Sequence, residues 1–270
     1  MVWLIVLALL LPAGNVKAAA FNSCVNCHGQ CRAADTAGHE CSWCHFGSAA
    51  TSRRDLAHRN LVPPSCADFR SESSQSVHSG AHLAELLACR RCHVVGGAGN
   101  RLAQNLDGAV RTLDVAQMRQ ALRQPAQQMP RFNLPAHDVD SLVSYLLHGA
   151  YASVAGSEQP PLVVHFTADN AVAQLPFERH CGGCHQVLSA QYGGLGTGRN
   201  GPNLSGLFSR FYPANAERHW NAELLQRWLR NPRQLRPVAI MPPLQLNDDE
   251  FAGLLQTFRV ADDCHTPPAR

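Results

Sequence analysis

Four copies of one pentapeptide, Cys-x-x-Cys-His, constrain this chain of 270 residues more than any other feature. They contain eight of the 11 cysteines and four of the 14 histidines. A histidine follows every second cysteine, which a random placement of histidines would not produce. The residues are Cys24, Cys27, Cys41, Cys44, Cys89, Cys92, Cys181 and Cys184, with His28, His45, His93 and His185.

This spacing is the attachment signature of c-type haem. Two thiols add across the porphyrin vinyl groups, and the adjacent histidine ligates the iron from one face. The sequence therefore predicts four covalently attached haem c groups with their iron. A zinc ribbon made from the first four cysteines, or a disulfide oxidoreductase, would use paired cysteines but would not require a histidine after each pair.

The first 20 residues are typical of an export signal. The apolar run Val2–Pro12 ends before three alanines at 18–20, and it is shorter than the roughly 20 residues that span a bilayer. We predict cleavage after Ala20, a periplasmic or otherwise exported bacterial protein, and no membrane span after cleavage. Such an oxidising compartment permits a disulfide between Cys31 and Cys66.

Composition excludes several classes of protein. Apolar residues make up 45% of the chain and charged residues 16%, which argues against intrinsic disorder. A net charge of +3 is too small to indicate nucleic-acid binding. Every basic residue except Lys17 is an arginine, and arginine offers the bidentate donors that suit haem propionates.

The fourth motif opens a longer pattern. It is followed by Gly-Pro-Asn-Leu at 201–204, by Met241 before a proline, and by a final apolar stripe with helical spacing. The stripe consists of Phe251, Leu254, Leu255 and Phe258. This order resembles class I cytochrome c over residues 173–260.

The resemblance implies a helical fold in which His185 and Met241 are the two axial ligands of the iron. It also implies that the carbonyl of Pro202 accepts a hydrogen bond from His185. Phe177, four residues before the motif, is implied to pack against an aromatic residue of the last helix.

Residues 89–147 repeat the pattern with shorter loops. Met129 corresponds to Met241, but it follows its haem histidine by 36 residues instead of 56. Asn105-Leu106 is the nearest counterpart of the Gly-Pro-Asn-Leu sequence, and Glu85 stands where Phe177 does. We predict Met129 as the second methionine ligand, since thioether sulfur is a soft donor suited to haem iron.

The segment 21–80 holds the first two motifs and no methionine, so histidine is the first choice for its distal ligands. The candidates are His39, His58 and His78, with His82 a weaker one. A segment this small has little core of its own, and covalent haem would form its hydrophobic centre.

We therefore predict an all-α protein with a loop-rich dihaem segment and two small class I cytochrome c-like domains. The predicted parts are a signal peptide at 1–20, the dihaem segment at 21–80, a reduced cytochrome c-like domain at 81–150, a linker at 151–168, a class I domain at 169–262 and a disordered tail at 263–270.

A series of haems in one chain favours electron transfer over catalysis. His/Met ligation raises the haem potential relative to bis-His ligation, so we expect electrons to pass from the N-terminal pair to the two later haems. The expected partners are other redox proteins, either a periplasmic carrier or a membrane reductase or oxidase. The chain resembles multihaem c-type cytochromes of bacterial respiration and, more loosely, cytochromes of selenite/tellurite-reduction operons. The alternative is a multihaem oxidoreductase, an oxyanion reductase or peroxidase, with an open haem site in the N-terminal pair.

Overall fold

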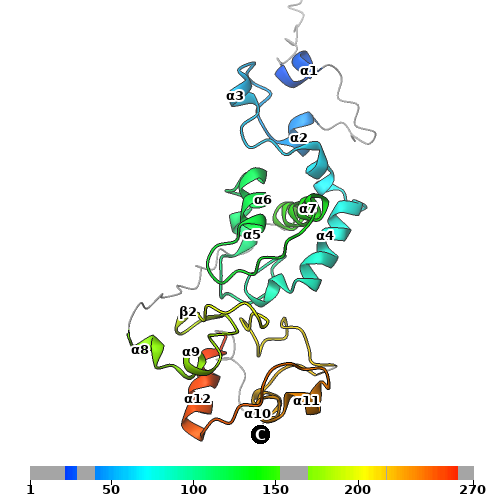
Figure 1. The fold of residues 1–270 in the computed structure, drawn as a ribbon. Helices are drawn as coiled ribbons and strands as arrows, with labels where there is room; N and C mark the ends of the chain where they lie inside the picture. Colours follow the sequence, from blue (N-terminus) through cyan, green and yellow to red (C-terminus); the bar gives the residue numbers. More distant parts are fainter. Residues whose placement is uncertain (1–21, 29–39, 153–169, 217, 261–270) are drawn as a thin grey trace, which may run out of the picture. The chain divides into compact units, whose positions relative to one another are not determined.

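The structure, a computed structural model, describes residues 22–28, 40–152, 170–216 and 218–260. The chain divides into two compact units, residues 1–59 and 60–270 (Figure 1). The described residues form helices and one two-stranded sheet, which confirms the all-α prediction. The predicted signal peptide and tail, most of the linker, Cys31, His39 and Cys264 fall outside the described residues.

The first unit contains three short helices and no extended hydrophobic core among its described residues. Two of the helices are the first two Cys-x-x-Cys-His motifs themselves. The helices are α1 (Ser23–His28), α2 (Cys41–His45) and α3 (Arg54–Ala57). Helices of this length are not stable alone in water, so this unit depends on tertiary contacts.

The second unit begins with a helical domain that ends at residue 152. Its elements are η1 (Pro64–Arg70, a 3₁₀ helix), α4 (Gln75–Leu86), η2 (Cys89–Arg91, a 3₁₀ helix), α5 (Leu106–Ala109), α6 (Val115–Arg123) and α7 (Ala136–Ala152). Both η1 and α4 pack against α7. Apolar side chains between these helices are buried, including Phe69, Val77 and Val143. The part of the predicted dihaem segment from residue 60 onward therefore belongs to the second unit, because its apolar residues have their core there.

Helices α4 and α7 approach each other closely at Gly80. A Cβ atom placed on Gly80 would overlap the backbone carbonyl of Ser141. Because that neighbour is backbone, the helices would have to separate to admit a side chain.

We expect Gly80→Ala to destabilise the holoprotein by about 1–3 kcal/mol, the usual cost of overpacking, in urea unfolding followed by circular dichroism. Gly108→Ala is the matched control, since Gly108 lies in helix α5 with open space around its Cα. It should be neutral or should gain up to about 1 kcal/mol of helix propensity. Equal midpoints for the two variants would contradict the close helix contact.

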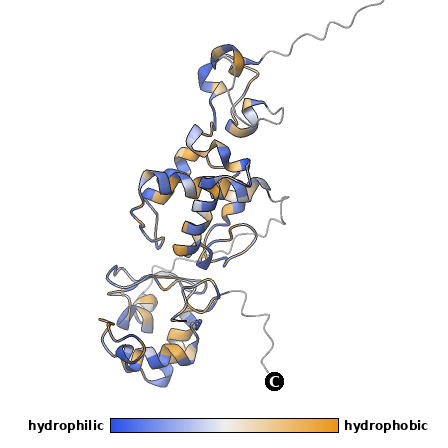
Figure 2. Cartoon of the chain, turned by 90° about the vertical axis from the view of Figure 1, so that its right-hand side faces the viewer, coloured by the Kyte–Doolittle hydropathy of each residue, from blue (hydrophilic) through white to orange (hydrophobic). Residues whose placement is uncertain are grey.

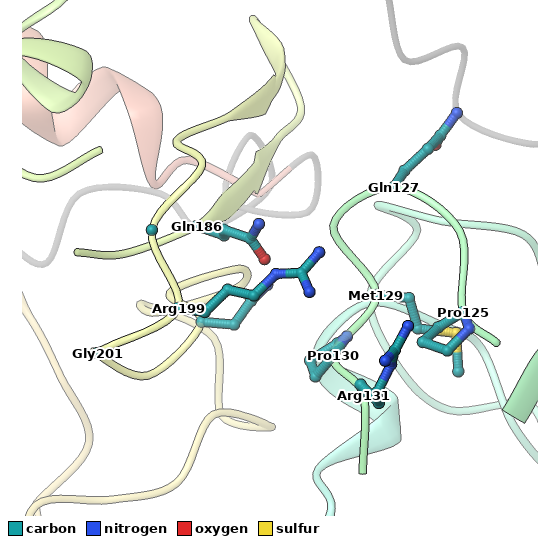
Figure 3. Close-up of a pocket in the computed structure, with 10 residues that line it drawn as sticks. Pro125, Gln127, Met129, Pro130, Arg131, Gln186, Arg199 and Gly201 are labelled. Carbon is teal, nitrogen blue, oxygen red and sulfur yellow. The ribbon is translucent and has the colours of Figure 1, made fainter. Parts of the chain in front are cut away.

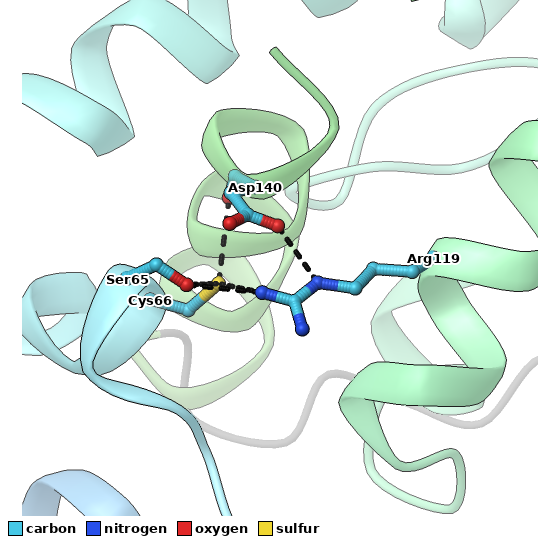
Figure 4. A network of polar contacts seen from close by, with 4 residues as sticks. All are labelled: Ser65, Cys66, Arg119 and Asp140. Atoms are coloured by element: carbon cyan, nitrogen blue, oxygen red, sulfur yellow. Dashed lines mark hydrogen bonds and ion pairs between the residues drawn. The ribbon is translucent and has the colours of Figure 1, made fainter. Parts of the chain in front are cut away.

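Cys66 is a free thiol and is fully buried on η1 against α7. The Cys31–Cys66 disulfide that export would permit is therefore not formed in this structure. The thiol lies beside a polar network in which Arg119 Nε donates to Asp140 at 2.7 Å and the same guanidinium donates to Ser65 at 3.0 Å (Figure 4). Burial raises the pKa of the Cys66 thiol. Burial against apolar side chains determines that the Cys66 sulfur is a free thiol. The number of cysteines in the sequence does not reveal this packing.

The second domain of this unit begins at residue 170. Its elements are α8 (Asn170–Ala173), α9 (Pro176–His180), β1 (Val187–Ser189), β2 (Gly193–Leu195), α10 (Ala222–Arg230), α11 (Pro232–Leu235) and α12 (Asp248–Thr257). β1 and β2 form an antiparallel hairpin in which Val187 pairs with Leu195. Apolar and polar stretches alternate along the helices in Figure 2, as amphipathic packing around a small core requires.

Phe177 anchors the core of this domain. It is fully buried, and its ring meets that of Phe258 edge-on at 6.1 Å between centroids. Phe208 contacts Phe258 in the same way at 5.6 Å. The implied contact between Phe177 and the last helical stripe is confirmed, and its partner is Phe258.

The start of α12 is fixed by Asn247 and Glu250, which form a reciprocal capping box. Glu250 also accepts a hydrogen bond from His180 at 3.0 Å and lies 3.5 Å from Arg179. The hydrogen bond from His180, followed by that from the Asn247 backbone, lowers the pKa of Glu250.

A carboxylate whose pKa is lowered by folding stabilises the fold above its unfolded pKa, and this contribution is lost as the pH falls through its folded pKa. We therefore expect Glu250→Gln to destabilise the protein near neutral pH and to converge with the parent protein in acid, measured as urea midpoints between pH 3 and 7. Asp249→Asn removes the same charge from the same helical turn and is the control. If the urea midpoint of Glu250→Gln were as far below that of the parent protein in acid as at neutral pH, the lowered pKa of Glu250 would be contradicted.

Candidate functional site

The fourth motif follows directly on α9, whose C-cap is Cys181. The backbone N–H of His185 donates to the carbonyl of Cys181 at 2.9 Å, which closes the pentapeptide into one helical turn. Cys181 is buried and Cys184 is exposed. Such a turn carries both thiols and the imidazole on one short segment, as attachment to a single porphyrin requires.

The ring of His185 is oriented by the main chain. Its Nδ1 lies 2.8 Å from the carbonyl oxygen of Pro202, the contact that the resemblance implies. Because a carbonyl can only accept, Nδ1 carries the proton and Nε2 keeps its lone pair for a metal.

The histidine of the third motif is oriented in the same way, by the backbone carbonyl of a different residue. His93 Nδ1 lies 2.7 Å from the carbonyl of Gln104, so Gln104 takes the place of Pro202. The backbone hydrogen bonds next to the two histidines also correspond. Leu106 donates to the residue after His93 at 3.0 Å, and Leu204 donates to the residue after His185 at 2.8 Å.

The sequence pattern did not identify Gln104. It precedes Asn105-Leu106 as Pro202 precedes Asn203-Leu204, and this alignment was the available signal. The acceptor is a backbone carbonyl, which any residue can supply, so residue type alone does not reveal it.

Met241 lies in an apolar environment, as the prediction of a methionine ligand requires. It packs against the buried cluster that contains Cys181 and Phe177. The indole N–H of Trp228 donates to the Met241 sulfur at 3.1 Å. The proposed ligand sulfur thus shares one core with a motif cysteine.

Met129 lines a cavity of about 190 Å³ within the second unit. The lining comes from two segments, one around Met129 and one next to the fourth motif, and it includes Arg131 and Arg199 but no carboxylate (Figure 3). Gln186, which directly follows His185, is on the opposite wall from Met129. Met129 and the loop of the fourth motif thus line the same cavity.

Hydrogen bonds connect the two domains beside this cavity. Arg91, within the third motif, donates to the carbonyl of Asn203 at 3.0 Å. The Asn203 side chain donates to the carbonyl of Gln128 at 2.8 Å, and Tyr212 donates to the Asn203 carbonyl at 3.1 Å. Asn203 is adjacent to Pro202, the acceptor for His185. The third motif and the ligand-orienting loop of the fourth are thus linked through one residue.

Burial dominates the electrostatics of the later motifs. It raises the pKa of Cys89 and of Cys181 to about 11 and lowers the pKa of His93. A buried imidazole with a lowered pKa remains neutral, and the neutral form is the one that ligates a metal.

The predicted distal ligands of the first two motifs lie in different places. The ring of His58 lies next to that of His28, with centroids 5.8 Å apart, whereas His78 is an exposed residue of α4 in the other unit. Cys41 is disulfide-bonded, and the other described cysteines are free. Thioether attachment at the second motif therefore requires that the Cys41 sulfur first be reduced.

The donors of the third and fourth motifs fit haem c. Each offers two free thiols and an imidazole whose Nδ1 is held by a carbonyl, and the fourth adds a methionine sulfur in a shared apolar core. A bound haem would supply an iron that cycles between ferrous and ferric states. The described residues contain no group of three or more His, Cys, Asp or Glu side chains arranged to hold a metal ion.

Comparison with known families agrees with this geometry. Residues 75–146 match the family model described as cytochrome c oxidase, cbb3-type, subunit III, and residues 171–256 match the model of cytochrome c. Neither the curated proteins nor the solved structures gave a match. Among the described helices, none has both the length and the apolar character needed to cross a membrane.

Proposed function

Because the chain contains two cytochrome c-type domains, we propose that it is a periplasmic tetrahaem c-type cytochrome that transfers electrons between respiratory redox proteins. The two domains hold the haems of the third and fourth motifs. The two additional Cys-x-x-Cys-His motifs in the first unit hold the other two.

The link through Asn203 is the observation that best supports transfer within the chain. It holds Arg91 of the third motif against the loop that orients His185. Electron transfer requires cofactors at a fixed, short separation, and hydrogen bonds between motif loops provide such a constraint. The residues of this contact act by positioning the two sites and do not themselves exchange electrons.

The type of axial ligand determines the direction that we propose for electron transfer. The first unit has no methionine in its described residues, whereas Met129 and Met241 serve the later haems. We propose that electrons enter at the lower-potential haems of the first unit and leave through the higher-potential domains. The donor and acceptor are then other redox proteins, a periplasmic carrier on one side and a membrane reductase or oxidase on the other.

The test is an anaerobic spectroelectrochemical titration of the exported holoprotein. We expect a lower-potential pair and a higher-potential pair of haems, and little carbon monoxide binding in the reduced state. Four nearly equal midpoints would overturn the proposed direction. Stoichiometric carbon monoxide binding would favour the oxidoreductase alternative, which needs an open coordination position.

A further inference from the structure

His28 and His58 are brought together although 30 positions separate them in the sequence. Their ring centroids are 5.8 Å apart and their planes are inclined by 35°. His28 belongs to the first motif at the end of α1, and His58 is the C-cap of α3. Both lie within residues 1–59, the first compact unit.

Backbone hydrogen bonds hold these two histidines in place. The Ser23 N–H donates to the carbonyl of Ala49 at 2.9 Å, and the Ser23 hydroxyl donates to the same oxygen at 3.1 Å. The Ser48 N–H donates to the carbonyl of Ala57 at 2.9 Å. The segment around residues 48–49 thus joins the start of α1 to the residue before His58. Ser23 is buried, so this connection is shielded from water.

The separation matches what one iron between two imidazoles needs. Metal–imidazole bonds are about 2 Å long and the ring centre lies about 1 Å beyond the nitrogen, so trans ligands place their centroids roughly 6 Å apart. Ring pairs without a metal have centroids about 4.5–7 Å apart, so the distance alone fits both arrangements and the His58 variants distinguish them. A tilt of 35° does not prevent both rings from directing a nitrogen at the same point.

We infer that His58 is the distal iron ligand of the haem attached at Cys24 and Cys27, an assignment that rests on the proposed function. His28 and His58 then close both axial positions of that haem. Any open coordination position in the N-terminal pair belongs to the second motif, at His45. The first haem is an electron-transfer centre and not a substrate site.

The test uses full-length exported holoprotein carrying His58→Ala or His58→Met. Mass spectrometry first counts the porphyrins in the parent protein, and a count without a haem at the first motif would defeat the proposed function and not only this ligand assignment. In His58→Ala we expect one haem to become high-spin by electron paramagnetic resonance and the reduced protein to bind one additional carbon monoxide. Added imidazole should reverse both changes.

His58→Met provides a second readout if the alanine variant does not accumulate. It should convert one bis-His spectrum into a His/Met spectrum and raise one midpoint potential. His137→Ala is the control, since the His137 side chain is 79% exposed on α7 and should leave all four haem spectra unchanged. Parent-like spectra in both His58 variants, or the same spectral change in His78→Ala instead, would overturn the assignment.

Discussion

We expect replacement of Met241 by histidine to lower the midpoint potential of one haem by on the order of 0.2 V, part of the roughly 0.8 V that axial ligands span. A second imidazole stabilises ferric iron more than a thioether does. The change is measured by spectroelectrochemical titration, together with loss of the near-infrared absorption of methionine-ligated ferric haem. Met129→His should have the same effect on a different haem.

Met118→Leu is the matched control for these variants. Met118 is buried in α6 and confined to packing, so leucine should preserve every midpoint and cost less than about 1.5 kcal/mol of stability. An unchanged set of potentials in Met241→His would remove Met241 from the coordination sphere.

Phe177→Ala should destabilise the second cytochrome domain by about 3–5 kcal/mol, the cost of deleting a fully buried aromatic side chain. The edge-on contact with Phe258 adds to the loss. Denaturant unfolding of the holoprotein, followed by the methionine-ligated haem absorption, measures it.

Phe251→Ala is the comparison for this variant, because Phe251 packs at the edge of the same cluster and is only partly buried. We expect it to cost distinctly less than Phe177→Ala. Equal losses would show that the haem, and not the Phe177–Phe258 pair, dominates the packing of this domain.

Local patterns predicted the parts of the site that lie close together in the sequence. The pentapeptides form helical turns, and the contact of His185 with the carbonyl of Pro202, which the resemblance to class I cytochrome c implied, is present in the structure. The contact of Phe177 with the last helical stripe, also implied by that resemblance, is made by Phe258.

Other features depend on backbone groups or on tertiary contacts. Gln104 serves through its carbonyl, so its side chain gives no sign of the role. The Arg91–Asn203 contact joins residues 112 positions apart, and no periodicity encodes it. The first compact unit ends at Arg59, within the predicted dihaem segment, because the core that receives Phe69 is completed by α7 far downstream.

The central claim is covalent haem at all four motifs, and intact-mass spectrometry of the chain exported from a host with haem-ligation machinery tests it most directly. We expect the mass of the mature polypeptide plus four porphyrins, with the Cys41 sulfur reduced and attached. A mass with three porphyrins and an intact Cys41 disulfide would contradict the tetrahaem assignment. Zinc or bare thiols at the motifs would contradict the account as a whole.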